Sequence, residues 1–280
     1  QAEKFREICH AIQSYPAACD LKMSLFCVAA VRCYHQGTIL KPIPPIFTTN
    51  DNVDMDGLVV VLKKIPQLAD VQEDDGDVVD FLHWLFVQQV HPQIVRVSPV
   101  DVKDIFEKFN WKQRELRPTH IFRIEVPPEC SAERKFGEFA EHYPTQFAFH
   151  GTKVENFQSI LHFGLAQHLN KRSVFGEGIY LSTDLSVSLT YSPLSPTWAH
   201  SALGERLSCV ALCEYVEHPD HFKCHKSSRK SDLPRNFIVV SNNEIIRVRF
   251  LLVYAKTQVT RQANESTIGR WMLQHKATLL

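Results

Sequence analysis

Several features that often reveal a protein's class are missing from this chain of 280 residues. Its formal net charge is +0, so its overall field gives no reason to expect nucleic-acid binding. No run reaches the roughly 18 apolar residues that span a membrane, and no signal peptide is recognisable. No Gly-x-Gly-x-x-Gly joins a strand to a helix, which disfavours a Rossmann-type dinucleotide fold. What is left is a globular composition, with 44% hydrophobic and 22% charged residues.

The eight cysteines are spread irregularly along the chain, a pattern typical of reduced thiols in a reducing compartment. Zinc is a second interpretation of one segment, because thiolate and imidazole groups crowd together at Cys209, Cys213, His218, His221, Cys224 and His225. Residues 207–216 alternate like a buried strand, however, which turns both of its cysteines to one face as small hydrophobic residues. The paired Cys-x-x-Cys spacing of a structural zinc site is also absent. We therefore predict no metal site.

Helical spacing dominates the first 92 residues. Apolar residues recur from Phe5 to Ile12, and Asp20 is predicted to cap a second helix that runs to about His35. Further helices are predicted over 58–68 and 78–90, separated by the acidic residues 73–77. We interpret that acidic stretch as a solvated turn, with a bound cation as the alternative. The pattern predicts a helical domain over residues 1–92, followed by a linker over 93–118.

Two glycine-containing segments carry the strongest functional signal. The apolar residues 146–149 predict a buried strand that delivers His150 to the edge of a sheet. Gly151 then lets the backbone approach a ligand closely. Further on, a strand over 178–182 presents Tyr180, and Gly176 and Gly178 permit a tight bend in front of it.

The residues after Tyr180 extend this pattern. Ser182, Thr183 and Asp184 are typical helix caps, and residues 185–191 have helical character. On such a helix Ser188 and Tyr191 are three positions apart and share a face. One hydroxyl and one aromatic ring are therefore predicted to point into a single pocket.

In their order and spacing these residues resemble the poly(ADP-ribose) polymerase family of ADP-ribosyltransferases, the diphtheria-toxin-like group with a His-Tyr-Glu signature. The resemblance covers roughly residues 119–256. It implies an α+β fold, in which an N-terminal helical bundle precedes a transferase domain with a mixed or antiparallel sheet over residues 119–257. It also implies that NAD is consumed as a substrate, and that nicotinamide is released.

The resemblance assigns a role to each residue of the pocket. His150 would hydrogen-bond the adenine-side ribose, and Thr152 would lie near the same sugar. The Gly151 backbone and the Ser188 hydroxyl would hold the nicotinamide carboxamide. Tyr180 and Tyr191 would sandwich the nicotinamide ring, and residues 167–177 would form a loop over the donor. Taken singly, such a histidine, tyrosine or serine is more often structural, and only the set as a whole favours an NAD pocket.

The third signature position departs from the family. It is expected thirteen residues before Phe250-Leu251-Leu252, which places it at Phe237. Residues 236–240 fit the required strand, 242–243 fit a turn, and 245–254 fit its return strand.

Polymerising members carry glutamate at this position, where the carboxylate binds a ribose hydroxyl and helps activate the acceptor during elongation. Phenylalanine can accept no such bond. Loss of a charge-assisted hydrogen bond costs roughly 1.5 to 3 kcal/mol, or about 10- to 150-fold in rate. We therefore predict mono-ADP-ribosylation of proteins, the chain itself included. The alternative is a catalytically weak or inactive module that binds NAD or serves a structural role at the endoplasmic reticulum.

A narrower resemblance bears on location. Residues 168–171, 175–178, 207–211 and 251–254 are similar to a small family member whose C-terminal anchor holds the transferase on the cytosolic face of the endoplasmic reticulum. The chain begins at Gln1 rather than methionine, so we expect a fragment in which residues 258–280 lead to an anchor beyond its end. Membrane contact is expected only through that anchor.

A cluster of basic residues precedes the strand that carries Phe237. It is interpreted as a solvated loop or, alternatively, as the border of the acceptor side, and consists of Lys223, Lys226, Arg229, Lys230 and Arg235.

Overall fold

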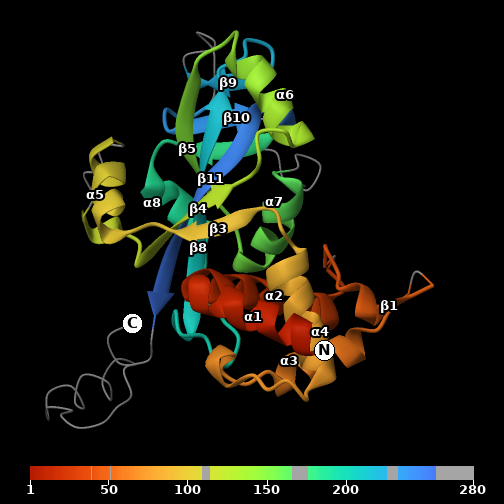
Figure 1. Ribbon diagram of the computed structural model, residues 1–280. Coiled ribbons are helices and arrows are strands. Elements are labelled where there is room, and N and C mark those ends of the chain that lie inside the picture. Colours follow the sequence, from red (N-terminus) through yellow and green to blue (C-terminus); the bar gives the residue numbers. More distant parts are fainter. Residues whose placement is uncertain (39, 51, 109–113, 166–175, 226–232, 257–280) are drawn as a thin grey trace, which may run out of the picture.

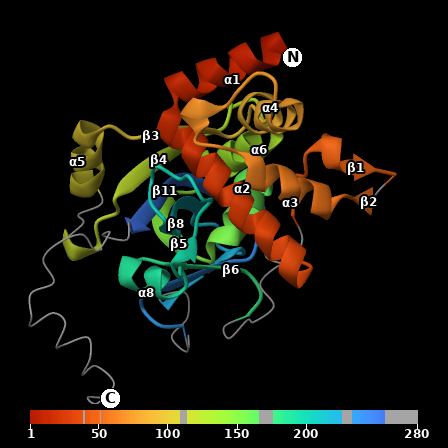
Figure 2. The same cartoon turned by 90° about the horizontal axis from the view of Figure 1, so that it is seen from below.

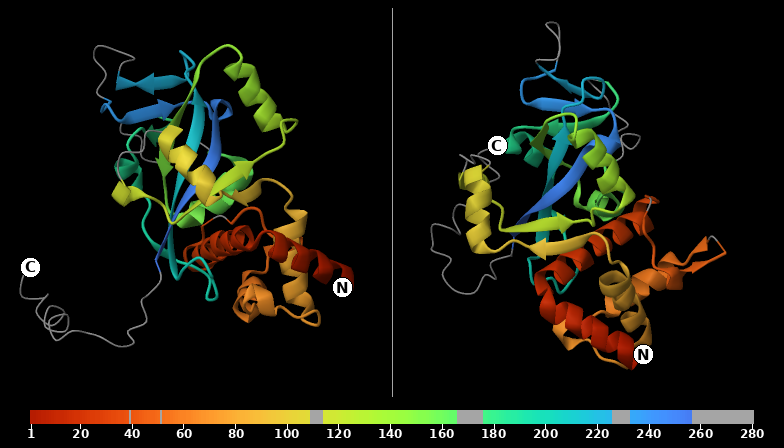
Figure 3. Two further views of the ribbon diagram at one scale, coloured as in Figure 1. Left: turned by 60° about the vertical axis from the view of Figure 1, so that its left-hand side comes forward. Right: turned by 45° about the horizontal axis from the view of Figure 1, so that its top comes forward.

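The structure is a computed structural model that describes residues 1–38, 40–50, 52–108, 114–165, 176–225 and 233–256. Four helices gather at one end of a large sheet, and the others flank its two faces (Figures 1 and 3). Within the described residues, no helix has the length and apolar character needed to cross a membrane. The α-helices are α1 Ala2–Ser14, α2 Pro16–Gln36, α3 Met55–Lys64, α4 Gly76–His83, α5 Pro99–Lys108, α6 Ser131–Ala140, α7 Phe157–Phe163 and α8 Leu185–Thr190.

The described part of the main sheet has nine strands in the order β3-β4-β11-β8-β5-β6-β10-β9, with β7 paired to β8. Every pairing in it is antiparallel. A separate two-stranded ribbon, β1 with β2, projects outward beside α3 (Figure 2). The predicted α+β class is confirmed. The strands are β1 Thr48–Thr49, β2 Asn52–Val53, β3 Gln93–Arg96, β4 His120–Glu125, β5 Thr145–Gly151, β6 Ile179–Ser182, β7 Ser195–Pro196, β8 Arg206–Val216, β9 Phe222–Cys224, β10 Phe237–Val240 and β11 Ile246–Lys256.

Shorter helical turns connect these elements. Helix α4 continues directly into η3, which is π-helical. The helix predicted over 78–90 is therefore present, but its hydrogen-bonding pattern changes after His83. The turns are η1 Pro45–Phe47, η2 Leu68–Asp70, η3 Trp84–Gln88, η4 Arg114–Leu116, η5 Val154–Asn156 and η8 Asn243–Ile245.

The caps of the N-terminal helices agree only partly with the sequence. The Asp54 side chain caps α3 by accepting a bond from Gly57, and Asp75 caps α4 from within the predicted acidic turn. Asp20, predicted as a cap, lies instead inside α2. Proline favours the first turn of a helix because it needs no hydrogen-bond acceptor there, and Pro16 starts α2 one turn earlier. The Asp20 carboxylate is therefore available for other contacts.

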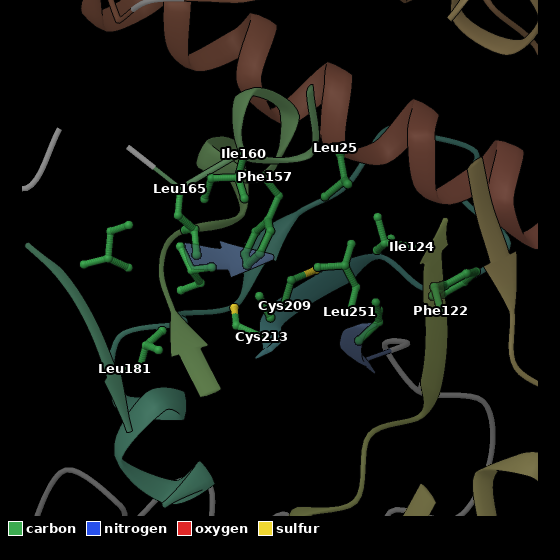
Figure 4. Packing of buried hydrophobic residues seen from close by; sticks show 14 of the residues in the cluster. Leu25, Phe122, Ile124, Phe157, Ile160, Leu165, Leu181, Cys209, Cys213 and Leu251 are labelled. Carbon is green, nitrogen blue, oxygen red and sulfur yellow. The ribbon is translucent and has the colours of Figure 1, made fainter. Parts of the chain in front are cut away.

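Helix α2 separates two hydrophobic cores and contributes side chains to both. Leu21, Leu25 and Val28 lie on one face of it and pack against the sheet and α7, as the close-up of Leu25 with Phe157 shows (Figure 4). The other face packs into the helical core with α3, α4 and η3, through Cys19, Met23, Phe26, Cys27 and Ala30. Figure 2 shows α2 crossing the molecule beside α1 and α3. The helix is apolar around most of its circumference because both sides are buried.

The opposite face of the sheet has a smaller core, covered by α5 and α8. Leu185 and Leu189 of α8 pack here near Phe149 of β5, and Phe106 of α5 packs near Leu252 of β11. The residues expected as a linker, 93–118, therefore include an element of this layer, and also β3, which pairs with β4. We propose a boundary near residue 92 all the same, because the helical core draws mainly on residues 8–86.

One predicted connection is wrong. The turn at 242–243 and the strand after it are present, but β10 and β11 do not form a hairpin. Strand β10 pairs with β6 and β9, whereas β11 pairs with β4 and β8. Both edges of β10 are thus already occupied, and the capped turn η8 leads the chain to a different part of the sheet.

Candidate active site

His150 lies at the end of β5 and is held in a defined chemical form. Its side chain is 8% exposed, and Nδ1 lies 2.9 Å from the carbonyl oxygen of Tyr180. A carbonyl can only accept, so Nδ1 carries the proton and donates. Burial lowers the pKa of His150, and the bond to the Tyr180 carbonyl opposes that effect only in part. The neutral ring then offers Nε2 as a hydrogen-bond acceptor.

This arrangement predicts how His150 titrates. We expect its pKa to lie below the ordinary value of 6.5, with the proton on Nδ1 in the neutral ring. Because the folded pKa is depressed, the free energy of unfolding falls as the pH drops below about 6.5 and levels off below the folded pKa. Nitrogen-15 NMR of labelled histidines, with His150→Gln to assign the resonance, measures both properties. A midpoint at or above 6.5, or a proton on Nε2, would contradict the arrangement.

Gly151 lets β5 approach the backbone of α8 closely. A Cβ atom at this position would lie 1.9 Å from the carbonyl oxygen of Ser188 and 2.7 Å from its carbonyl carbon. Any larger side chain therefore requires the helix to move. The Ser188 hydroxyl reaches back across the same contact and donates to the carbonyl of Phe149 at 3.2 Å. The two residues assigned to the carboxamide thus lie together.

Tyr180 is fixed at both ends. Its hydroxyl donates to the carbonyl of Gly176 at 2.7 Å, and its own carbonyl accepts from His150. Gly178 has a φ of +153°, and a Cβ there would lie 2.8 Å from the carbonyl oxygen of Val240. The bend in front of β6 therefore needs glycine at this position.

Strand register brings the third signature position beside Tyr180. Phe237 opens β10 opposite Ser182 of β6, and Ser182 is also opposite Phe149 of β5. Directly opposite residues of antiparallel strands share a face, and so do residues two apart on one strand. Tyr180 and Phe237 are therefore diagonal neighbours on one face. Helix α8 packs on that face through Leu185 and its neighbours.

Tyr191 and Thr152 lie at the edges of this group. Tyr191 follows the last residue of α8 and is 58% exposed, so its ring is open to solvent although Ser188, one turn earlier, is buried. The Thr152 hydroxyl accepts a bond from Asn156 at 2.8 Å. The structure therefore brings His150 to the backbone of Tyr180 and Gly151 to the backbone of Ser188, with Phe237 on the same face as Tyr180.

The start of α8 is held as its sequence predicts. Asp184 accepts hydrogen bonds from both the backbone and the hydroxyl of Ser186, and the Ser182 hydroxyl accepts from the Asp184 backbone. The predicted cap is confirmed. Because the cap sets where the helix begins, it also sets the position of Ser188 one turn later.

A series of buried serines supports the site and was not predicted from the sequence. Ser208 of β8 donates to the carbonyl of Ser192 at 2.6 Å, and Ser192 donates to the carbonyl of Ser188 at 3.2 Å. Both Ser192 and Ser208 are 4% exposed. These bonds connect the end of α8 to β8. Serine carries no periodic signal, so only the fold identifies these positions.

Some predicted parts of the site fall outside the described residues. Of the loop expected over the donor, only Gly176 and Glu177 are described, and both are exposed. Of the basic cluster, Lys223 and Arg235 are described and exposed, while Lys226, Arg229 and Lys230 lie outside. A hollow of about 660 Å³ between α1, α2, η3 and β3 contains none of the predicted site residues.

The cysteines and histidines of residues 209–225 lie in different environments. Cys209 and Cys213 face the core from β8, as predicted, and burial raises the pKa of Cys209 to about 12. His218 instead contacts the rings of Tyr143 and His221, with centroids 4.6 and 4.8 Å away. Within the described ranges, no three His, Cys, Asp or Glu side chains are placed to hold a metal ion, and this includes the acidic turn before α4.

Comparison with known proteins accounts for both parts of the chain. Residues 10–86 match the ARTD15 N-terminal domain, and residues 86–232 match the poly(ADP-ribose) polymerase catalytic domain. Human protein mono-ADP-ribosyltransferase PARP16 is 34% identical over 283 residues, which cover 94% of this chain and 86% of the relative. Mouse PARP16 is also 34% identical, over 92% of this chain and 84% of its own length. Mouse protein mono-ADP-ribosyltransferase PARP8 is 25% identical over 86% of this chain and 32% of its own length. The resemblance predicted from the sequence is confirmed, and the chain belongs to the poly(ADP-ribose) polymerase family.

Proposed function

We propose that NAD binds against His150, Gly151, Tyr180 and Ser188, and that one ADP-ribose passes from it to side chains of proteins, including this chain. The reaction class follows from the family and its relatives: the chain is an NAD-dependent mono-ADP-ribosyltransferase. The observation that best supports the location is the set of contacts joining these residues, His150 to Tyr180 and Gly151 to Ser188.

His150 and Ser188 each keep a hydrogen-bond acceptor position that suits the proposed role. The neutral His150 ring can accept a bond from a ribose hydroxyl at Nε2, since Nδ1 is committed to Tyr180. The Ser188 hydroxyl donates its one proton to Phe149, so it is left to accept from the carboxamide NH₂. Tyr180 and the exposed ring of Tyr191 would hold the nicotinamide between them, each aromatic pair contributing about 0.5 to 1.5 kcal/mol.

Transfer needs little chemistry beyond this positioning. The bond between ribose and nicotinamide breaks, the electron pair leaves with neutral nicotinamide, and the sugar becomes oxocarbenium-like. A carboxylate oxygen of an acceptor side chain then forms the new bond to the sugar, and no proton has to be removed. A sugar hydroxyl, by contrast, needs a base. Phe237 offers none, which supports the transfer of a single unit.

Labelled NAD tests the proposed site. We expect wild-type protein to acquire single ADP-ribose units, and His150→Ala and Tyr180→Ala to lose roughly 100-fold in rate, because a mispositioned donor costs about that much. Val60→Ala is the control, since Val60 is 51% exposed on α3, away from the sheet. Labelling is followed by intact-mass spectrometry.

Three other outcomes are informative. Normal labelling of both the His150→Ala and the Tyr180→Ala variant would contradict the proposed location of the NAD site. NAD binding without labelling by wild-type protein would favour the inactive module. Long heterogeneous chains would contradict mono-ADP-ribosylation.

We also propose that the full protein is held on the cytosolic face of the endoplasmic reticulum by an anchor that follows the transferase. The narrower sequence resemblance supports this location. Fluorescence microscopy of the full-length protein, with protease protection to determine its orientation, tests it. Uniform fluorescence throughout the cytosol would contradict it.

A further inference from the structure

Asp20 is a buried carboxylate in the middle of α2. Its side chain is 4% exposed, and it takes part in none of the ion pairs among the described residues. A buried carboxylate without a cation needs several hydrogen-bond donors to remain stable. Asp20 has four, and only Ser24 belongs to its own helix.

The other three donors come from one short segment of the transferase, residues 198–202. The Ser201 hydroxyl donates to Asp20 at 2.6 Å, the Ala202 backbone N–H at 2.5 Å, and the Trp198 indole N–H at 3.4 Å. Hydrogen bonds to an ionised acceptor are stronger and more directional than neutral ones. The Asp20 carboxylate therefore holds this segment at a defined position against the N-terminal helices, which are called the helical unit below.

Packing reinforces the same contact. Trp198 is 6% exposed and belongs to the helical core, although it lies more than 100 residues beyond α4 in the sequence. The base of the segment is closed by Thr197, whose hydroxyl donates to the carbonyl of Gly204 at 2.8 Å. One loop of the transferase is thus anchored in the helical unit, by the buried indole of Trp198 and by its bonds to the Asp20 carboxylate.

This loop connects β7 to β8, the strand that holds the end of α8. It begins after β7, which follows α8, and it ends at β8. Ser208 of β8 holds Ser192, Ser192 holds the Ser188 carbonyl, and Ser188 reaches Phe149 beside His150. The segment that Asp20 holds therefore lies, along the chain, between Ser192 and Ser208, the two residues whose bonds connect the end of α8 to β8.

We propose that Asp20 is a positioning residue for the transferase: through residues 198–202 it fixes the end of α8, and so the helical unit sets the affinity of the pocket for NAD. The inference rests on the proposed NAD site. Asp20 itself touches no reacting atom. It acts by holding the loop whose displacement would move Ser188 and Tyr191.

The test compares Asp20→Asn with Leu58→Ala in the whole chain. Asparagine keeps the size of Asp20 but removes the charge and replaces an acceptor with a donor, which opposes the Ala202 N–H. Leu58 is fully buried in the helical core and makes none of the hydrogen bonds to Asp20, so its truncation lowers stability while those bonds stay in place. For each variant we would measure the melting temperature, kcat and KM for NAD, and hydrogen–deuterium exchange over residues 185–204.

We expect Asp20→Asn to raise KM for NAD roughly 2- to 30-fold, the range of couplings transmitted between sites, and to speed exchange over residues 185–204. Leu58→Ala should lower the melting temperature and leave both properties unchanged at temperatures well below its transition. Ser201→Ala removes one donor and should shift KM in the same direction by a smaller factor, which keeps the test valid if Asp20→Asn folds poorly.

Two results would overturn the inference: an unchanged KM in Asp20→Asn and Ser201→Ala, or an equal rise in KM in Leu58→Ala. Both are distinct from failure of the proposed function, in which wild-type protein would bind and consume NAD no better than His150→Ala.

Discussion

Gly151→Ala is expected to reduce ADP-ribose transfer by about 100-fold and to lower the free energy of unfolding by about 1 to 3 kcal/mol. The added methyl group would lie 1.9 Å from a backbone oxygen of Ser188, so no side-chain rotation can relieve the clash. Helix α8 must shift, and Ser188 moves with it. Steady-state kinetics and urea denaturation measure the two effects.

Gly137→Ala is the matched control for this substitution. Gly137 lies inside α6, and its added Cβ would meet nothing within 4 Å. Alanine is the better helix former, so we expect a stabilisation of about 0.5 to 1 kcal/mol and unchanged kinetics. If Gly151→Ala behaved in the same way, the close approach of β5 to α8 would not be a requirement of the site.

Phe237→Glu is expected to accelerate transfer roughly 10- to 150-fold without producing polymer. The substitution supplies a carboxylate beside Tyr180, where a charge-assisted bond to ribose contributes about 1.5 to 3 kcal/mol. Phe237 is only half-buried at the start of β10, so the new charge stays in contact with water. Elongation also requires an acceptor surface that admits a growing chain, which one residue does not create. Initial rates and the length of the product on gels measure the two parts.

Phe237→Gln separates charge from shape in this experiment. The amide can accept a neutral hydrogen bond in a similar position, so we expect it to recover only a small part of the acceleration. Equal rates of transfer with phenylalanine, glutamine and glutamate at this position would show that residue 237 does not contact the ribose. Polymer formed by the glutamate variant would mean that the acceptor side already accommodates chains.

Local signals in the sequence were sufficient for the parts of the site that depend on neighbours in the chain. The apolar run before His150, the glycines before Tyr180 and the cap at Asp184 all predict elements that the structure contains. Each is signalled by residues within a few positions of it, such as the Ser186–Asp184 pair that caps α8. Strand identity and helix start are encoded at this range.

Contacts between distant segments were not predictable in the same way. Asp20 fits the pattern of a helix cap, but its donors Ser201 and Ala202 lie more than 180 residues further along the chain. The hairpin expected between β10 and β11 fits local turn chemistry, yet both edges of β10 pair with other strands. Strand β3 is only four residues long and owes its conformation to pairing with β4. In each case a tertiary partner outweighs the local preference.

The two-sided burial of α2 bears on how the protein folds. A fragment beginning at residue 93 would leave the sheet without the helix that covers Phe157, and a fragment ending there would expose Leu21 and Leu25. The two halves are therefore expected to unfold in one cooperative transition. The boundary near residue 92 thus separates two cores that share α2 as a common side.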